Sequence, residues 1–307
     1  MMKKTKIICI VGATASGKTD LSVKLAKAIG GEIISADSMQ VYRDMPIATA
    51  VATQDEQDGV PHHLVEFLDA GQTFSVADFV ERARVLTAEI TARGNVPLIV
   101  GGTGLFVDSL VKNICFSDVG SNDELRSELE AMDTDALYSK LRDLDFEASL
   151  QIHPNNRKRV IRALELCMSG TSKTQQNEMS TLTESPYDAL YIGVGYEDRQ
   201  RLYDRINKRV DLMLEAGLEN EARQMLGRQG ATAAQAIGHK ELADYINGRA
   251  TLDEAVDSLK QATRRYAKRQ LTWFRRNENI KWLYADTMSK DELINSAVAL
   301  AKDFLKN

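Results

Sequence analysis

Eight consecutive residues near the start of the chain have the types and the spacing of a phosphate-binding loop. The pattern G-x-x-x-x-G-K-[ST] is matched at every fixed position by Gly12, Ala13, Thr14, Ala15, Ser16, Gly17, Lys18 and Thr19. In such a loop the backbone N–H groups surround phosphate oxygens, the lysine adds a full positive charge, and the threonine hydroxyl can bind Mg²⁺. The loop predicts a bound phosphate ester, which can be a nucleoside triphosphate or any diphosphate.

A carboxylate follows the second apolar run of the chain. Asp37 comes directly after residues 32–36. Ligands of an open α/β sheet bind beyond the carboxyl ends of its strands, so we expect Asp37 near the phosphate loop, where it could accept a proton or bind a metal indirectly. A turn cap is an equally good interpretation of Asp37 and Ser38. The polar segment that continues through Gln40 to Arg43 could read the edge of a base, or could be an ordinary loop.

Positive charge is concentrated in two places on a chain with a formal net charge of −5. Residues 157–162 hold four cations, and residues 260–276 hold a second group with no acidic residue. Local patches on an acidic chain favour docking of a polyanion at one place and predict salt-sensitive binding. The second patch could instead be a solvated helix face.

Other polar residues give weaker signals. Arg205 and Arg209 belong to a stripe of arginines at four-residue spacing, which could aim at a phosphate or pair with neighbouring acids. His62 and His63 lack partner ligands, so a structural role is favoured over a metal site. His239 indicates no function by its sequence context.

The elements that must position these residues alternate along the chain. Short apolar runs lie at residues 6–11, 32–36, 96–100 and 190–194, with helical spacing over residues 18–29 and 75–94. This alternation predicts a parallel, doubly wound α/β sheet. Strand signals are replaced by short helical repeats over residues 121–168, and helices dominate again after residue 202. We expect a core over 1–114, a helical insertion over 115–186, and completion of the core with basic helices over 187–307.

Composition bounds the class of protein. The 307 residues are 43% hydrophobic and 27% charged, which excludes collagen-like, disordered and disulfide-scaffold classes. No apolar run approaches the roughly 18 residues of a membrane span. Three distant cysteines in apolar sequence, Cys9, Cys115 and Cys167, are typical of reduced core residues. We therefore expect a cytoplasmic protein with no membrane partner.

Several longer motifs show a resemblance to a known family, the tRNA dimethylallyltransferases (tRNA isopentenyltransferases). The resemblance runs in order over about residues 7–285. Its motifs are the phosphate loop and residues 35–43, 60–64, 74–79, 101–105, 159–165, 205–210, 237–241 and 266–274. The segments around Asp37 and before Phe274 are far more specific than the phosphate loop alone.

The resemblance implies a fold and a reaction. The fold would be a P-loop nucleotide-kinase-like parallel sheet with an inserted all-helical domain and a helical C-terminus. The reaction would transfer a dimethylallyl group from dimethylallyl diphosphate to the exocyclic amine of the adenosine 3′ of the anticodon in tRNA. Diphosphate would leave with the help of Mg²⁺ bound at Thr19, and the enzyme would act as a monomer on the tRNA anticodon arm.

The resemblance also assigns residues. Asp37 would be the general base, and Thr103 and Arg209 would bind the diphosphate, with Arg205 as the alternative to Arg209. Contacts to tRNA would come from Asp37, Ser38, Met39, Gln40, Lys158, Arg159, Val160, Ile161 and Arg162.

The chain departs from the family pattern at few positions. Ala13 stands where proline is common, Asp44 where glycine is common, and Val51 where a lysine commonly follows the Thr-Ala pair. Three other functions stay open: an adenylate isopentenyltransferase acting on free nucleotides, an ATP-dependent small-molecule kinase, and a nucleotide-switched binding module.

Overall fold

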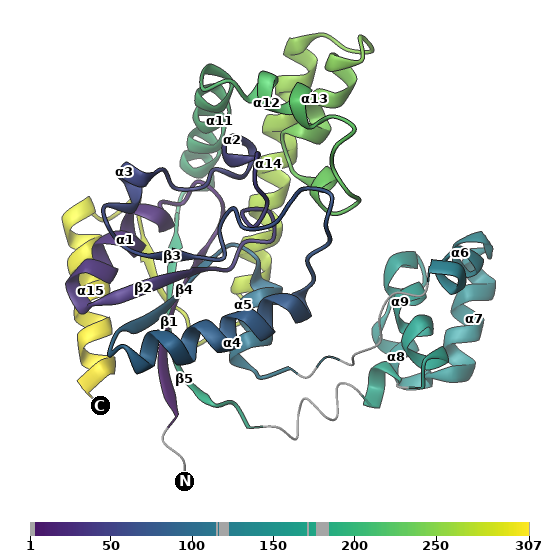
Figure 1. Cartoon of the computed structure of the whole chain (residues 1–307), viewed down its shortest axis with the longest axis horizontal. Helices are drawn as coiled ribbons and strands as arrows, with labels where there is room; N and C mark the ends of the chain where they lie inside the picture. The colour runs from purple at the N-terminus through teal and green to yellow at the C-terminus, as the bar shows by residue number, and fades with distance from the viewer. Residues whose placement is uncertain (1–3, 115, 117–122, 171, 176–183, 307) are drawn as a thin grey trace. The chain divides into compact units, whose positions relative to one another are not determined.

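The computed structural model describes residues 4–114, 116, 123–170, 172–175 and 184–306 (Figure 1). The chain divides into two compact units, one formed by Met1–Leu110 with Tyr187–Asn307 and the other by Val111–Pro186. No helix in the described ranges has the length and apolar character needed to cross a bilayer.

The first unit is built on a six-stranded sheet in the order β3-β2-β4-β1-β5-β6, with every pair parallel. The strands are β1 Thr5–Gly12, β2 Gly31–Ser35, β3 His62–His63, β4 Val96–Gly101, β5 Tyr187–Gly195 and β6 Lys281–Tyr284. The predicted parallel α/β fold is confirmed. The apolar pattern does not predict the edge strands β3 and β6, because two and four residues are too short to show a period.

The helices of this unit precede and follow the second unit in sequence. They are α1 Lys18–Ile29, α2 Pro46–Thr49, α3 Gln54–Gln57, α4 Val76–Ala92, α5 Gly104–Val111, α11 Arg199–Glu215, α12 Leu218–Met225, α13 His239–Ile246, α14 Leu252–Phe274 and α15 Lys290–Lys306, with a 3₁₀ turn at Ala233–Gln235.

Both faces of the sheet are covered, as the long apolar strands of a parallel sheet require. On one face Ile8 of β1 belongs to a core with Leu21 of α1 and Ala297 of α15, and these two helices lie side by side in Figure 1. On the other face, burial and the nearby carboxylate of Asp108 in α5 raise the pKa of the Cys9 thiol. The carboxyl ends of the central strands are left open to form a site.

The second unit is helical. It contains α6 Asp123–Ala131, α7 Thr134–Leu144, α8 Phe146–Gln151 and α9 Arg157–Met168. Leu129, Leu137, Leu141 and Leu164 are buried at its centre. Cys115 and most of the polar stretch from 170 to 185 lie outside the described residues.

Candidate active site

The phosphate loop joins the end of β1 to the start of α1. Gly12 has a φ of +151°, and a Cβ there would lie 2.4 Å from the carbonyl oxygen of Val194. Ala15 has a φ of +62°, and Gly17, with a φ of +100°, precedes the first residue of α1. Left-handed residues in such a turn direct successive N–H groups to one side, which is the geometry of an anion-binding loop. The Ser16 hydroxyl is buried and has no hydrogen-bond partner among the described residues.

The Lys18 ammonium interacts electrostatically with both Asp37 and Arg209. Its Nζ donates to the carbonyl oxygen of Ala13 at 2.7 Å. Burial lowers the pKa of Lys18 from 10.5 to about 8, Asp37 raises it in part, and Arg209 lowers it further. The loop lysine, the candidate base and the candidate diphosphate ligand are therefore electrostatic neighbours.

Asp37 follows β2 and serves as a turn cap. Its Oδ1 accepts a hydrogen bond from the backbone N–H of Met39 at 2.9 Å. No other hydrogen bond from the described residues reaches the Asp37 carboxylate. Asp37 also lines a cavity above the phosphate loop, so its role as a turn cap is compatible with the predicted role in the site.

Thr103 supports the segment that carries Asp37. The Thr103 hydroxyl accepts a hydrogen bond from the backbone N–H of Ser38 at 3.1 Å. Burial, with a contribution from Asp37, raises the pKa of Tyr266, and a hydrogen bond with Thr103 opposes the rise. Thr103 is not among the described residues that line the cavity. A direct contact between Thr103 and diphosphate therefore stays a prediction.

The two candidate arginines of α11 have different surroundings. Arg205 is exposed, its Nε donates to the carbonyl oxygen of Ala15 at 3.1 Å, and its guanidinium lies 5.8 Å from the ring centre of Tyr196. Arg209 is deeper, and burial lowers its pKa while Asp37 opposes the change. In the described part of the chain no hydrogen bond or ion pair occupies the Arg209 guanidinium.

Gln270 of α14 is a site residue that the sequence reasoning missed. Its Oε1 accepts from the backbone N–H of Thr14 at 2.8 Å, and its Nε2 donates to the carbonyl oxygen of Gly102 at 3.0 Å. The side chain thus ties the phosphate loop to the end of β4. The sequence signals are the motif over residues 266–274, which contains Gln270, and Gly102, where a Cβ would lie 2.1 Å from the Gln270 Nε2.

These residues surround a cavity of about 1120 Å³. Its lining includes residues 14–20 of the phosphate loop and α1, residues 37–40, residues 48–52, and side chains of α11 and α14. The α11 and α14 walls contribute the cations Arg205, Lys208, Arg209, Arg265 and Arg269. The volume lies near the upper end of the range of about 300–1,000 Å³ that is typical of small-ligand sites.

No cluster of three or more histidine, cysteine, aspartate or glutamate ligands occurs within the described ranges. His62 Nδ1 lies 2.8 Å from the carbonyl oxygen of Val60, and His63 Nε2 lies 2.7 Å from Glu32 Oε2. Both rings thus have structural partners. Thr19 and Asp37, whose side chains carry oxygen atoms, both line the cavity.

The candidate tRNA-binding residues of α9 separate by burial. Lys158, Arg159 and Arg162 are exposed. Val160 and Ile161 are 1% and 3% exposed and pack in the core of the helical unit, so the three exposed cations present the side chains of this range that are accessible to tRNA. The period of a helix alternates surface and core positions, and a contiguous range cannot all face a ligand.

Two cations expected in the basic patches have structural roles instead. Arg157 donates to the carbonyl oxygens of Glu130 and Met132 near the end of α6. Lys260 pairs with Asp211 at 2.6 Å. Each is therefore less available to a polyanion than its exposed neighbours.

Comparison with known proteins gives one consistent result. The family model described as IPP transferase matches residues 40–277. The tRNA dimethylallyltransferase of Halalkalibacterium halodurans is 48% identical over 298 residues, 95% of each chain, and that of Staphylococcus haemolyticus is 44% identical over 96% of this chain and 91% of its own.

Solved structures agree. A full-length tRNA isopentenylpyrophosphate transferase from Bacillus halodurans is 45% identical, with a TM-score of 0.74 over 99% of this chain and 98% of its own. A eukaryotic dimethylallyltransferase described as acting on tRNA is 29% identical, with a TM-score of 0.86 over 99% of this chain and 80% of its own.

Proposed function

The chain belongs to the IPP transferase family and is a tRNA-prenylating transferase; from this premise we propose its substrates and the residues that act on them. The donor is dimethylallyl diphosphate, and the acceptor is the exocyclic amine of the adenosine 3′ of the anticodon. One observation supports the proposal. The phosphate loop, Arg209 and Asp37 line a single cavity, and the Asp37 carboxylate raises the pKa of both Lys18 and Arg209.

The cationic side of the cavity binds the leaving group. Lys18, the loop amides and Arg209 supply donors for diphosphate, and the free guanidinium of Arg209 favours it over Arg205 as the direct ligand. Arg205 holds the loop through Ala15. Negative charge grows on diphosphate as the allylic C–O bond breaks, and removing one such preorganised donor typically costs about 2.7–4 kcal/mol of barrier.

The donor set also fits Mg²⁺. In phosphate sites this ion is held by one or two protein oxygens, substrate phosphates and water, and Thr19 and Asp37 offer such oxygens beside Lys18. We assign Thr19 as the direct ligand. When bound, the ion neutralises charge on the diphosphate oxygens.

Asp37 acts on the acceptor. The amine nitrogen forms the new C–N bond as the C–O bond of the donor breaks, diphosphate leaves with the bonding pair, and the amine proton passes to the Asp37 carboxylate. An aspartate with a reference pKa of about 3.9 is a weak base, but the amine becomes acidic as it is alkylated, so transfer is favourable within the transition state.

The acceptor base must leave its stack to reach this cavity. Exposed Lys158, Arg159 and Arg162 of the helical unit are suited to hold the phosphates of the anticodon arm, as are Arg265 and Arg269 at the cavity. The proposal includes action as a monomer and a cytoplasmic location, and a tRNA substrate supports the location.

A single assay tests the substrates. Labelled dimethylallyl diphosphate is supplied with unmodified tRNA, with AMP or with ATP, and the acceptor that gains label is identified. Label on tRNA alone is the expected result. Label on AMP but not on tRNA would favour the free-nucleotide enzyme, and ATP turnover without prenyl transfer would favour a kinase.

A further inference from the structure

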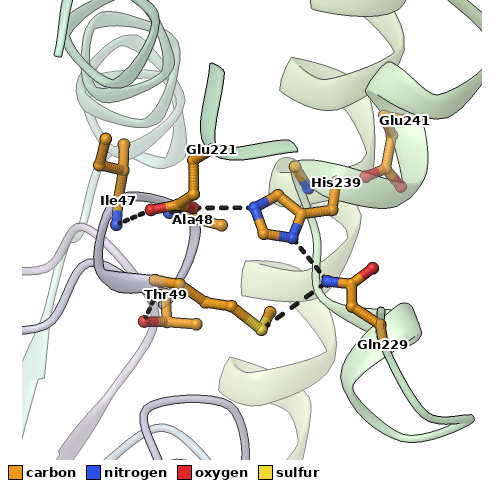
Figure 2. A network of polar contacts seen from close by, with 9 residues as sticks. Ile47, Ala48, Thr49, Glu221, Gln229, His239 and Glu241 are labelled. Carbon is orange, nitrogen blue, oxygen red and sulfur yellow. Dashed lines mark hydrogen bonds and ion pairs between the residues drawn. The ribbon is translucent and has the colours of Figure 1, made fainter. Parts of the chain in front are cut away.

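A buried carboxylate from α12 caps a helical turn in the cavity wall. The backbone N–H groups of Ile47 and Ala48 donate to Glu221 Oε2 and Oε1 at 2.8 and 2.9 Å (Figure 2). The turn, α2, has no other cap at this end, because Met45 at the N-cap position makes no side-chain bond and Pro46 has no N–H. Glu221 therefore satisfies both free N–H groups at the start of α2.

His239 holds Glu221 in this orientation. The ring is 4% exposed, and its Nε2 lies 2.8 Å from Glu221 Oε1. Its Nδ1 lies 2.7 Å from the Nε2 of Gln229, which also approaches the sulfur of Met45 at 3.7 Å. An amide NH₂ only donates and a carboxylate only accepts, so with Gln229 in this orientation we assign a neutral imidazole that donates from Nε2 and accepts at Nδ1. Gln229 then donates to His239, and His239 donates to Glu221.

The helix α2, which Glu221 caps, also binds the side chain of Gln40 in the cavity wall. The carbonyl oxygens of Thr49 and Ala50, at the other end of α2, accept from Gln40 Nε2 at 3.3 and 3.2 Å. Gln40 Oε1 accepts from the Ser35 hydroxyl at 2.8 Å. Gln40 lines the cavity three residues after Asp37. A continuous set of hydrogen bonds thus runs from α12 and α13 to the segment that bears the proposed base.

Apolar packing anchors this segment mainly where α2 begins, because Met45 at the N-cap position is fully buried. None of the four residues of α2 is fully buried, and Ile47 and Ala48 are only partly buried against the core formed by α11, α12, α13 and α14. A change in the polar cap should therefore move this wall rather than unfold the unit. Residues 48–52, which follow the capped N–H groups, all line the cavity.

We propose that Glu221, oriented by His239, is a positioning residue for prenyl transfer: it fixes the wall formed by residues 45–52 and, through Gln40, the part of the cavity that receives the acceptor nucleoside. The proposal rests on the tRNA-prenylating function. It predicts that loss of the cap weakens use of tRNA and leaves use of the prenyl diphosphate unchanged, because Gln270 and Arg205 hold the phosphate loop through Thr14 and Ala15.

The test compares Glu221→Gln with Glu219→Gln. An amide presents one acceptor in place of two, so at least one of the three donors to Glu221 loses its partner. We expect the KM for tRNA to rise about tenfold, the loss of one hydrogen bond to a charged group, with the KM for dimethylallyl diphosphate within about twofold of wild type. Glu219 lies on the same helix and pairs with Arg223 at 2.8 Å, away from α2, so the control removes the same charge without uncapping the turn.

Two substitutions at His239 separate orientation from packing. His239→Gln keeps a donor for Glu221 and should retain near-normal KM for tRNA, whereas His239→Leu removes the donor and should match Glu221→Gln. Hydrogen exchange over residues 45–52, measured on each folded variant, should quicken in Glu221→Gln and His239→Leu and stay unchanged in Glu219→Gln. Hydrogen exchange requires no turnover, so it also tests the positioning role in a variant whose stability is low.

The outcomes are distinct. Equal rises in both KM values, an unchanged KM for tRNA, or unchanged exchange over residues 45–52 would each overturn the positioning role. If wild-type enzyme transfers no label to tRNA, the function itself fails and the inference fails with it. If wild type is active and the variants match it, only the inference fails.

Discussion

The charge of Lys18 should govern how the affinity for prenyl diphosphate changes with pH. Its pKa of about 8 means that the free enzyme begins to lose this charge at a pH where an ordinary lysine keeps it. A bound diphosphate favours the charged ammonium and raises the pKa in the complex. The complex therefore takes up a proton above about pH 8, and affinity falls as pH rises.

The size of the effect follows from the pKa. If only the charged lysine binds, the dissociation constant scales with one plus the ratio of neutral to charged Lys18, which is about 1.1 at pH 7 and about 11 at pH 9. Kd should rise about tenfold over this range, or about 1.4 kcal/mol. An ordinary lysine with a pKa of about 10.4 would change Kd by only a few per cent.

The assay is equilibrium binding of labelled dimethylallyl diphosphate to the free enzyme at several pH values. Phosphate monoesters complete their last ionisation near pH 6, so the ligand charge should be nearly constant across the range. Titration calorimetry in two buffers of different ionisation enthalpy reports proton uptake, which should be about half a proton per site at pH 8. Neither measurement requires turnover.

Two variants sharpen this test because the neighbours of Lys18 act in opposite directions. Asp37 raises the pKa of Lys18 and Arg209 lowers it. The midpoint of the pH profile should therefore fall in Asp37→Asn and rise in Arg209→Gln, whatever happens to the absolute affinity. A flat profile between pH 7 and pH 9, or a midpoint that rises in Asp37→Asn, would refute the electrostatic reasoning.

Two further predictions concern the acceptor, and a third concerns the stability of the helical unit. Asp37→Ala should lower kcat at least about a hundredfold with little change in the KM for tRNA, and turnover near wild type in single-turnover assays would point to another base. Replacing Lys158 and Arg162 together by Ala should weaken tRNA binding and reduce its salt slope by about one for each phosphate that the variant no longer neutralises, whereas an unchanged slope would remove them from the interface. Arg157→Ala should instead lower the thermal stability of the helical unit, because carbonyl groups near the end of α6 lose their donor, and an unaltered melting curve would contradict that role.

The central fold could be predicted because its signals are local. Four strands of the sheet appear in the sequence as apolar runs ended by glycine or a polar turn, and the phosphate loop has fixed spacing within eight residues. Neighbours in sequence stay neighbours in space, so short-range patterns suffice. The edge strands and Gln270 depend on partners elsewhere: the bond from Thr14 to Gln270 joins residues 256 apart. A glutamine in a basic stretch of helix resembles a surface residue until the fold brings the loop to it.

The sequence alone could not decide between Arg205 and Arg209 as the candidate ligand of diphosphate. Arg205 and Arg209 occupy one stripe of α11, and helical periodicity assigns both to one face. How far each guanidinium is buried depends on the elements that pack over that face. Arg205 donates to the carbonyl oxygen of Ala15 and remains exposed, whereas Arg209 is more buried and its pKa is affected by the Asp37 carboxylate. His239 presents the same difficulty, since its partners Glu221 and Gln229 fall at no motif spacing. Arg209 is partly buried with no hydrogen-bond partner among the described residues, and His239 is buried with two partners. Both properties exist only in three dimensions, and they are the basis of the roles proposed for the two residues.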